Sequence, residues 1–186
     1  EKFVNKIPVK KHDHVLIPAG TVHCSGADTM VLEISATPYI FTFKLWDWGR
    51  VDLDGKPRPI HLEHGAANIQ WYRNTEWVHR NLVNAVAEVY TGENGTVVRT
   101  GLHEREFLDT FRFTSSSTLP VHRNVSVHML NLVDGTRAVL RSKCAAFPPL
   151  ELHYAETCIV PQAAGDYEIS SPDGSEVNVI LACVRN

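Results

Sequence analysis

The stretch IPAGTVH, residues 17–23, decides how the chain is expected to fold. Its spacing is P-x-G-x-x-H, and apolar residues precede the proline. Proline restricts φ and glycine tolerates positive φ, so Pro18 and Gly20 predict a tight turn between two strands. The turn is expected to hold His23 in a fixed register, facing the interior of a barrel. Because neutral imidazole is the commonest metal ligand, His23 is a candidate ligand; the alternative is a hydrogen-bonded structural histidine.

The rest of the chain reads mainly as short strands. Apolar segments separated by turn sequences predict strands from residue 86 onward, at 86–91, 96–101, 106–114, 121–133, 136–142, 150–160, 166–170 and 176–184. Further strands are expected upstream, at 1–9, 14–18, 30–35 and 40–46, with one short helix near 61–70. Many short strands spaced 8–12 residues apart predict an all-β sandwich or barrel. The last strand is apolar on nearly both faces, which predicts a central position.

Composition narrows the class of protein. The 186 residues are 44% hydrophobic and carry a formal net charge of −3, without a basic block. This charge pattern predicts no nucleic-acid partner, and no apolar run approaches the roughly 18 residues of a membrane span. The four cysteines show no C-x-x-C spacing and are expected to be reduced, apolar and buried, as in a cytoplasmic protein: Cys24, Cys144, Cys158 and Cys183.

Three residues match, in register, the second conserved motif of the cupins: Pro18, Gly20 and His23. Residues 30–35, 42–50 and 55–64 then follow in an order that resembles the class I mannose-6-phosphate isomerases, most strongly over residues 13–70. The sequence departs from that family's pattern at Ala36-Thr37-Pro38, where the family has Ser-Asp, and at Lys44, where it has arginine.

The resemblance implies a double-stranded β-helix, the jelly-roll-like cupin fold, and a zinc-dependent enzyme. Its reaction would interconvert mannose 6-phosphate and fructose 6-phosphate. By matching, His23 is a zinc ligand, Lys44 and Arg50 are catalytic and substrate-binding cations, and Glu33 is a substrate-binding residue beside the site. Core packing is expected of Trp46 and Trp48, with stacking on a sugar as the alternative.

The resemblance also implies a domain division. The family's other zinc ligands lie upstream of the segment that matches here, and only 22 residues precede His23. We therefore interpret residues 1–50 as the C-terminal half of a catalytic cupin, 51–75 as a linker with the helix, and 76–186 as a C-terminal cupin. A local cluster of His12, His14 and His23 is a weaker alternative for metal binding. On this interpretation the isolated segment lacks tightly bound zinc and isomerase activity.

A faint repeat suggests a second, decayed site. Residues 159–166 (IVPQAAGD) echo 16–23 (LIPAGTVH), so that Asp166 stands where the first copy has His23. Aligning the second half with the first cupin motif adds His122, Asn124 and His128 to a possible pocket cluster. Neutral asparagine is a poor ligand for a transition metal, which favours a cupin kept for structure. The rival hypothesis for the whole chain is a non-catalytic cupin that binds a sugar or serves as a structural domain.

Overall fold

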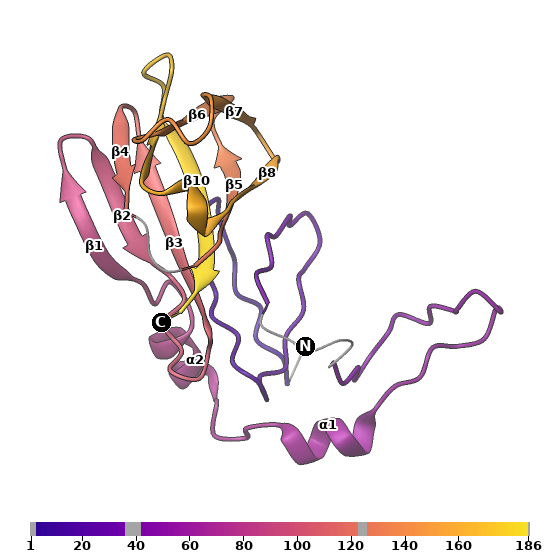
Figure 1. The fold of residues 1–186 in the computed structure, drawn as a ribbon. Coiled ribbons are helices and arrows are strands. Elements are labelled where there is room, and N and C mark those ends of the chain that lie inside the picture. The colour runs from indigo at the N-terminus through magenta and orange to yellow at the C-terminus, as the bar shows by residue number, and fades with distance from the viewer. Residues whose placement is uncertain (1–2, 36–41, 123–125, 186) are drawn as a thin grey trace. The chain divides into compact units, whose positions relative to one another are not determined.

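A computed structural model of the chain describes residues 3–35, 42–122 and 126–185 (Figure 1). The expected strand at 40–46 therefore lies partly outside the described residues. Ala36-Thr37-Pro38 and Asn124 lie outside them entirely. The chain divides into two compact units, Glu1–Val83 and Asn84–Asn186. Each unit is considered by itself below.

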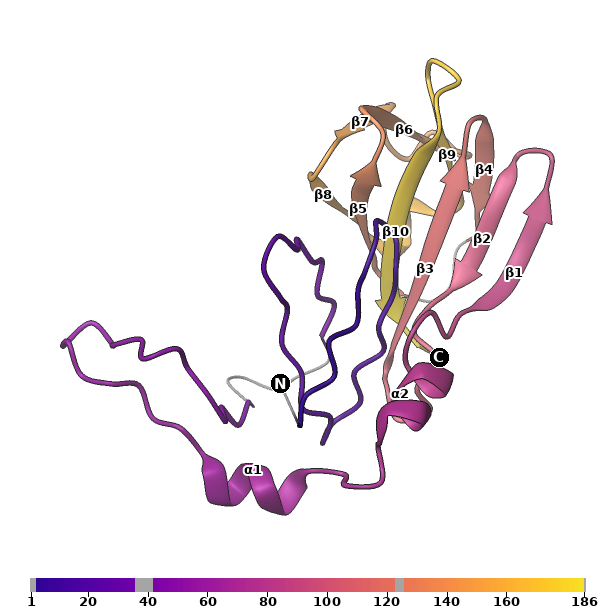
Figure 2. The ribbon, with the colours of Figure 1, turned by 180° about the vertical axis from the view of Figure 1, so that it is seen from behind.

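The second unit, Asn84–Asn186, consists of two antiparallel sheets (Figures 1 and 2). The six-stranded sheet has the order β1-β2-β3-β10-β5-β8, with β1 Ala87–Gly92, β2 Gly95–Arg99, β3 Leu108–Ser115, β10 Val177–Val184, β5 His128–Asp134 and β8 Thr157–Val160. The four-stranded sheet has the order β4-β9-β6-β7, with β4 Thr118–Val121, β9 Tyr167–Ser170, β6 Arg137–Ser142 and β7 Leu150–His153. A short 3-10 helix, η1 Gln162–Ala164, precedes β9.

Strand β10 is central, as its apolar faces predicted. It pairs with β3 from Val177↔Ser115 to Val184↔Leu108, and its other edge pairs with β5. Alternate residues of β5 and β10 point into one core, to which both sheets contribute. The innermost of these side chains are fully buried: Leu119, Leu130, Leu132, Leu140, Leu152, Tyr167, Ile169, Val177 and Val179. Burial of apolar area on this scale is the main term that stabilises a β-barrel.

Two of the expected strands are each divided in the structure. The segment 121–133 contains the end of β4 and most of β5, and the segment 150–160 contains β7 and β8. The second break is a turn in which Ala155 adopts a φ of 64° and the Glu156 carboxylate accepts the backbone N–H of His153 at 2.8 Å. No glycine or proline marks that turn, which explains why the sequence pattern did not separate the strands.

The first unit, Glu1–Val83, contains two helices. Helix α1, Leu62–Asn68, confirms the helix expected near 61–70. Helix α2, Thr75–Asn81, was not predicted, although its start carries a capping signal: the Asn74 side chain accepts the backbone N–H of Trp77 at 3.0 Å. At seven residues, α2 is too short for a clear apolar periodicity.

The strands expected in the first unit are wrong for its described residues. Over 3–35 and 42–83, extended segments form no sheet, and β pairing is limited to isolated bridges, Val15↔Val83 and Val51↔Pro57. Extended chain becomes a stable strand only when a neighbour satisfies its backbone groups. Among the described residues, the expected strand at 14–18 has only a short contact of this kind, the Val15↔Val83 bridge with the Leu16 N–H donating to the Leu82 carbonyl at 2.9 Å, and the segment 30–35 pairs with no strand.

Only some of the four cysteines are buried, as the sequence predicted for all of them. All four are free; Cys183 is buried and Cys158 half-buried, but Cys24 and Cys144 are exposed, which contradicts the expectation that all are buried. Within the described residues, no helix is long and apolar enough to cross a membrane.

Candidate functional site

The turn at Pro18 forms as predicted. The backbone N–H of Thr21 donates to the carbonyl of Pro18 at 3.2 Å, and Gly20 adopts a φ of 82°. A Cβ on Gly20 would lie 2.6 Å from the Asn68 carbonyl oxygen, so both the backbone conformation and the available space require glycine. The Gly20 carbonyl accepts the N–H of Gln70 at 3.0 Å, which ties the turn to the segment after α1.

His23 follows this turn but does not face the interior of a barrel. Its side chain is exposed, which contradicts the expected orientation, because the residues after the turn form no paired strand in the described part of the chain. Its Nδ1 lies 2.9 Å from the Thr21 carbonyl oxygen, an acceptor. Nδ1 therefore carries the proton in this contact, and the lone pair of the neutral ring is on Nε2, as in a metal-ligating histidine.

Lys44 is held by two reciprocal hydrogen bonds to His61. The Lys44 N–H donates to His61 Nδ1 at 3.2 Å, and the His61 N–H donates to the Lys44 carbonyl at 2.7 Å. The neighbouring Phe43 ring stacks on His64, with centroids 5.6 Å apart, and a Cβ on Gly65 would lie 2.3 Å from Leu45. Gly65, which weakens a helix by about 1 kcal/mol relative to alanine, thus makes room for the segment that carries Lys44.

The carboxylate of Asp47 is buried next to Lys44, a position that the sequence did not predict. Asp47 is 9% exposed and accepts two hydrogen bonds from Arg58, Nε to Oδ2 and Nη2 to Oδ1, each 2.5 Å. The Lys44 ammonium lies 3.5 Å from the same carboxylate. The hydrogen bond from Arg58 holds the pKa of Asp47 below its ordinary value, and that pair raises the pKa of Arg58. Asp47 and Arg58 both lie in the segments that resemble the isomerases, 42–50 and 55–64, but the resemblance did not indicate that these two residues pair.

The other expected site residues are exposed and spread over the first unit. Arg50 lies in the same loop as Lys44 and Asp47, where its N–H donates to the Asp47 carbonyl at 2.9 Å. Glu33 is exposed on the extended segment that precedes residue 36. The structure thus places Lys44 and Arg50 in one loop, whereas His23 and Glu33 lie on two other segments.

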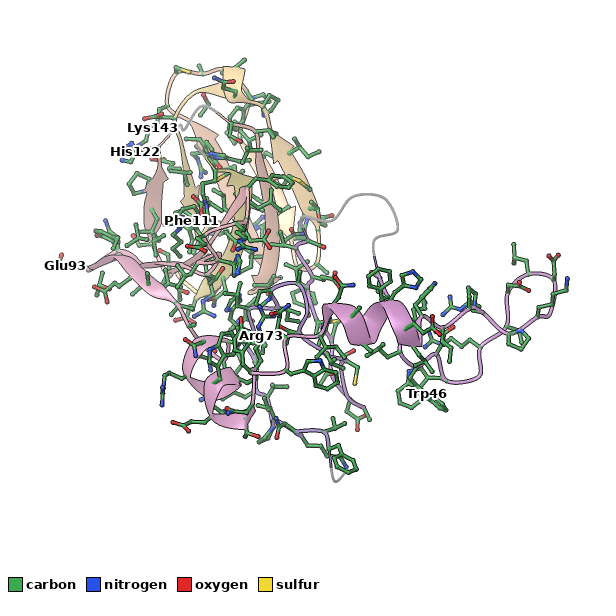
Figure 3. The ribbon with its side chains drawn as sticks, turned by 90° about the horizontal axis from the view of Figure 1, so that it is seen from below. Trp46, Arg73, Glu93, Phe111, His122 and Lys143 are labelled. Carbon is green, nitrogen blue, oxygen red and sulfur yellow. The ribbon has the colours of Figure 1, made fainter. Side chains whose placement is uncertain are left out.

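The tryptophans of this loop are not core residues of the first unit. Trp46, which Figure 3 labels, is 70% exposed. Trp48 is 68% exposed and meets it edge to face, with centroids 6.5 Å apart. The expectation of core packing is wrong for the chain as described. Their exposure leaves both rings available to a partner surface.

The described residues contain no assembled metal site. Residues 3–35, 42–122 and 126–185 contain no group of three His, Cys, Asp or Glu side chains close enough to hold an ion. The alternative cluster of His12, His14 and His23 is therefore not assembled. His23, with its lone pair on an exposed Nε2, fits one position of a zinc site, which usually needs three or four protein ligands.

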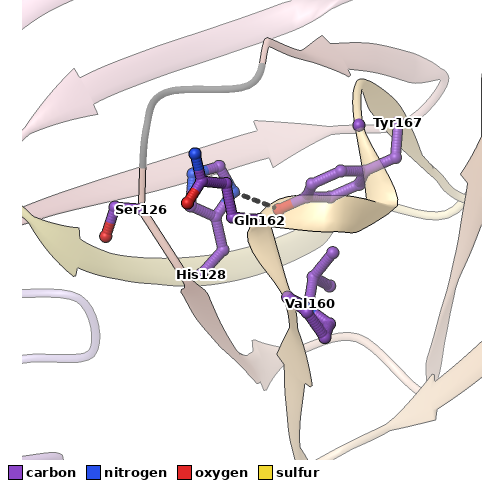
Figure 4. Close-up of a pocket in the computed structure, with 7 residues that line it drawn as sticks. Ser126, His128, Val160, Gln162 and Tyr167 are labelled. Atoms are coloured by element: carbon purple, nitrogen blue, oxygen red, sulfur yellow. Dashed lines mark hydrogen bonds between the residues drawn. The ribbon is translucent and has the colours of Figure 1, made fainter.

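The cluster expected in the second unit is also dispersed. His122 and Asp166 form an exposed pair, with Nδ1 3.2 Å from Oδ2. His128 instead points into the core, where its Nδ1 lies 2.8 Å from the hydroxyl of Tyr167 (Figure 4). His128 and Tyr167, together with Ser126, Val160 and Gln162, line a cavity of about 10 Å³. This is roughly the space of one water. This cavity is too small for a sugar.

Burial controls the titration of this pair. Desolvation lowers the pKa of His128, and burial raises the pKa of Tyr167. A neutral imidazole beside a neutral hydroxyl is therefore the stable state of the folded unit.

Two antiparallel sheets closed over one core define the second unit as a cupin β-barrel. The chain aligns with the structure of the mannose 6-phosphate isomerase from Bacillus subtilis with a TM-score of 0.56, over 75% of this chain and 39% of that one, at 13% identity. This similarity supports the fold. The expectation of an all-β cupin is confirmed, with two α-helices where one was expected.

Sequence similarity points to the same enzymes. The chain is 35% identical over 63 residues to the mannose-6-phosphate isomerase of Streptococcus mutans, a match that covers 34% of this chain and 20% of that protein. It is 33% identical over 70 residues to the mannose-6-phosphate isomerase ManA of Bacillus subtilis, covering 38% and 22%. The chain thus spans about a fifth of the length of these relatives, and no family model matches it. The expected resemblance to mannose-6-phosphate isomerases is confirmed.

Proposed function

We propose that this chain is the C-terminal portion of a cytoplasmic mannose-6-phosphate isomerase. Residues 1–50 supply half of its catalytic cupin, 51–75 are a linker, and 76–186 are a C-terminal cupin. The substrate is a hexose phosphate, and the reaction interconverts mannose 6-phosphate and fructose 6-phosphate. The similarity to isomerases over about a third of the chain supports the reaction class.

The exposed apolar surface of the first unit is the observation that carries the half-cupin proposal. Met30, Val31 and Leu32 are 83%, 66% and 48% exposed, and Val22 is 60% exposed. In contrast, Leu82, 2% exposed, is the one large apolar side chain that is buried among the described residues of this unit. Large exposed apolar surface indicates an absent partner. Strands from an upstream segment of the same protein would both pair with residues 14–18 and 30–35 and cover this surface.

Zinc is the cofactor of the proposed enzyme, and when bound it supplies Lewis acidity at the substrate's carbonyl and hydroxyl oxygens. His23 would hold the ion through Nε2. Its Nδ1 contact with the Thr21 carbonyl sets the ring's tautomer and orientation, which is the usual second interaction of a ligating histidine. The remaining ligands would come from the upstream segment.

The loop at 44–50 supplies the cations of the proposed site. Arg50 is exposed and offers a planar fork suited to a phosphate group, whereas the Lys44 ammonium acts as a point charge. Asp47 neutralises part of this charge, because its carboxylate lies 3.5 Å from the Lys44 ammonium, although it also accepts two hydrogen bonds from Arg58. Because Asp47 would stay paired with Arg58, the Lys44 ammonium could leave Asp47 and bind a phosphate group instead. Glu33 would contact the substrate's hydroxyl groups.

The test compares this chain with the protein encoded by the complete reading frame, using metal analysis and a coupled fructose 6-phosphate assay. We expect zinc and activity in the complete protein and neither in the 186-residue chain. In the complete protein, Arg50→Ala should lower kcat/KM for mannose 6-phosphate about 10- to 100-fold, the size of a lost hydrogen bond to a charged group. The matched control is Arg80→Ala, which removes an exposed arginine paired with Glu76.

Two outcomes would overturn the proposal. Stoichiometric zinc in the 186-residue chain that is lost on His23→Ala would show that ligands within this chain suffice. A complete protein without metal or activity would favour the second candidate, a non-catalytic cupin that binds a sugar or acts as a structural domain. The small cavity at His128 and Tyr167 favours the structural role within this candidate, because it has no room for a sugar.

A further inference from the structure

We infer that Arg73 is a positioning residue that holds the Pro18 turn and, through Thr21, sets the orientation of His23. The inference rests on the proposed function for its consequence in metal binding, but the contact itself is a property of the first unit. Arg73 has no place in the expected site, and it lies fifty residues beyond His23 in the sequence.

One nitrogen of Arg73 contacts most of the turn. Its Nη1 lies 3.1 Å from the carbonyl oxygen of Pro18, 2.8 Å from that of Ala19, and 2.5 Å from Oγ1 of Thr21. A guanidinium donates through N–H groups in a fixed plane, so these three acceptors must keep their relative positions. The N–H of Gln70 binds the Gly20 carbonyl from the same segment. Arg73 and Gln70 together thus engage every residue from Pro18 to Thr21.

Two aromatic rings also hold the guanidinium in place. Its Cζ lies 5.6 Å from the centroid of the Tyr72 ring and 5.3 Å from that of Trp77, a cation–π arrangement with both rings. The two rings meet edge to face, with centroids 5.6 Å apart, and the Asn74 cap binds the backbone of Trp77. The Arg73 Nε is buried and without a hydrogen-bond partner among the described residues. The side chain therefore gives up one hydrogen bond while its Nη1 reaches the turn.

Thr21 connects this clamp to the histidine. Its Oγ1 accepts from Arg73, and its carbonyl oxygen accepts from His23 Nδ1 at 2.9 Å. Rotation of the Thr21 backbone would move that carbonyl away from the ring and release the imidazole. A clamped Thr21 thus favours the tautomer with the proton on Nδ1 and the lone pair on Nε2. Groups that orient a metal-binding histidine in this way typically change metal affinity 10- to 100-fold when they are removed.

The first test measures the tautomer of His23 in the 186-residue chain by nitrogen NMR of its imidazole, at a pH where the ring is neutral. We expect the Nδ1–H form in the unaltered chain and a shift toward Nε2–H in Arg73→Ala. Thr21→Val, which keeps the carbonyl and removes Oγ1, should shift the population partway in the same direction. Arg80→Ala on α2 is the matched control and should leave the tautomer unchanged. An Nδ1–H population equal in all four chains would overturn the inference.

The second test measures zinc affinity in the protein encoded by the complete reading frame. We expect Arg73→Ala to weaken zinc binding about 10-fold, the lower end of the range for a group that orients a ligand. Arg73→Lys should recover part of this loss, since an ammonium reaches fewer of the three oxygens at once. Equal zinc affinity in Arg73→Ala and the unaltered protein would contradict the inference. A purely structural role would instead lower the melting temperature and leave both the tautomer and the affinity unchanged.

The two tests separate this inference from the proposed function. If the complete protein binds no zinc, the proposed function fails, whereas the tautomer shift in the 186-residue chain still reports on Arg73. If the complete protein binds zinc and neither Arg73 variant changes the tautomer or the affinity, only the inference fails. If Arg73→Ala does not fold, Thr21→Val and Arg73→Lys decide, because both preserve most of the packing.

Discussion

The two units of the chain have similar sequences in one respect and different structures. Both contain short apolar segments between turns, and both were expected to form strands. In the second unit the segments pair, and Leu130 and Leu132 are completely buried. In the first unit they form no sheet over the described residues, apart from isolated bridges, and Leu32 is 48% exposed. An apolar segment thus becomes a strand only where a partner covers its face and pairs its backbone, which is why β-propensity depends on context.

The largest expected difference between the units concerns a leucine in each. Leu130→Ala should lower the free energy of unfolding of the barrel by about 2–5 kcal/mol, because it leaves a cavity in a filled core. Leu32→Ala in the same 186-residue chain should change it by no more than about 0.5 kcal/mol, as expected for an exposed side chain. Urea unfolding followed by circular dichroism measures both. In the complete protein, Leu32→Ala should become destabilising, since an upstream strand would cover that side chain.

Equal effects of the two substitutions in the 186-residue chain would break the comparison. A large loss for Leu32→Ala would mean that the first unit already has a core of its own. A small loss for Leu130→Ala would mean that the barrel interior can collapse around the vacated space.

A smaller effect concerns the titration of His128 in the second unit. Because burial lowers the pKa of His128 in the folded barrel, the unfolded chain binds a proton that the folded unit rejects. The stabilisation is fully present above the unfolded pKa of about 6.5. It decreases as the pH falls through that value toward the lower folded pKa. This one residue should therefore account for at most about 1.4 kcal/mol of stability lost between about pH 7.5 and 5.5.

The measurement is urea unfolding at both pH values for the unaltered chain and for His128→Gln. The dependence should be weaker in His128→Gln, because glutamine does not titrate. His122→Gln, at an exposed pair with Asp166 in the same unit, is the control and should keep most of the dependence. An identical slope for the unaltered chain and His128→Gln would show that burial of this imidazole has no thermodynamic effect.

The barrel was predictable from sequence because its signals are local. Turn dipeptides such as Asn94-Gly95 and alternating apolar residues specified most strand positions. Apolar residues on nearly both faces of the β10 segment predicted its central position in the sheet. The turn after Pro18 was predictable for the same reason. Its echo at Pro161 shares the hydrogen bond, with the Ala164 N–H donating to the Pro161 carbonyl at 3.0 Å, but forms the 3-10 helix η1 instead of a turn with a positive φ. In both copies a proline sets the start of an i to i+3 turn.

The missed features depend on residues far apart in sequence. Arg73 contacts the Pro18 turn across more than fifty residues, and Arg58 binds Asp47 across eleven. Neither contact leaves a periodicity or a spacing that a single sequence reveals. The orientation of His23 failed for a different reason: the motif specified the turn, but an inward-facing position requires neighbouring strands to form the barrel wall. The roles of Lys44, Arg50, Glu33 and His23 remain predictions.

The central claim is that the first unit is half of a cupin whose partner strands come from an upstream segment. Amide hydrogen exchange tests this claim most directly. The 186-residue chain and the complete protein would be compared residue by residue. We expect strong protection of β5 and β10 in both, and stronger protection of residues 14–18 and 30–35 in the complete protein than in the 186-residue chain. Rapid exchange of those two segments in the complete protein, or equal protection of them in the 186-residue chain, would contradict the account.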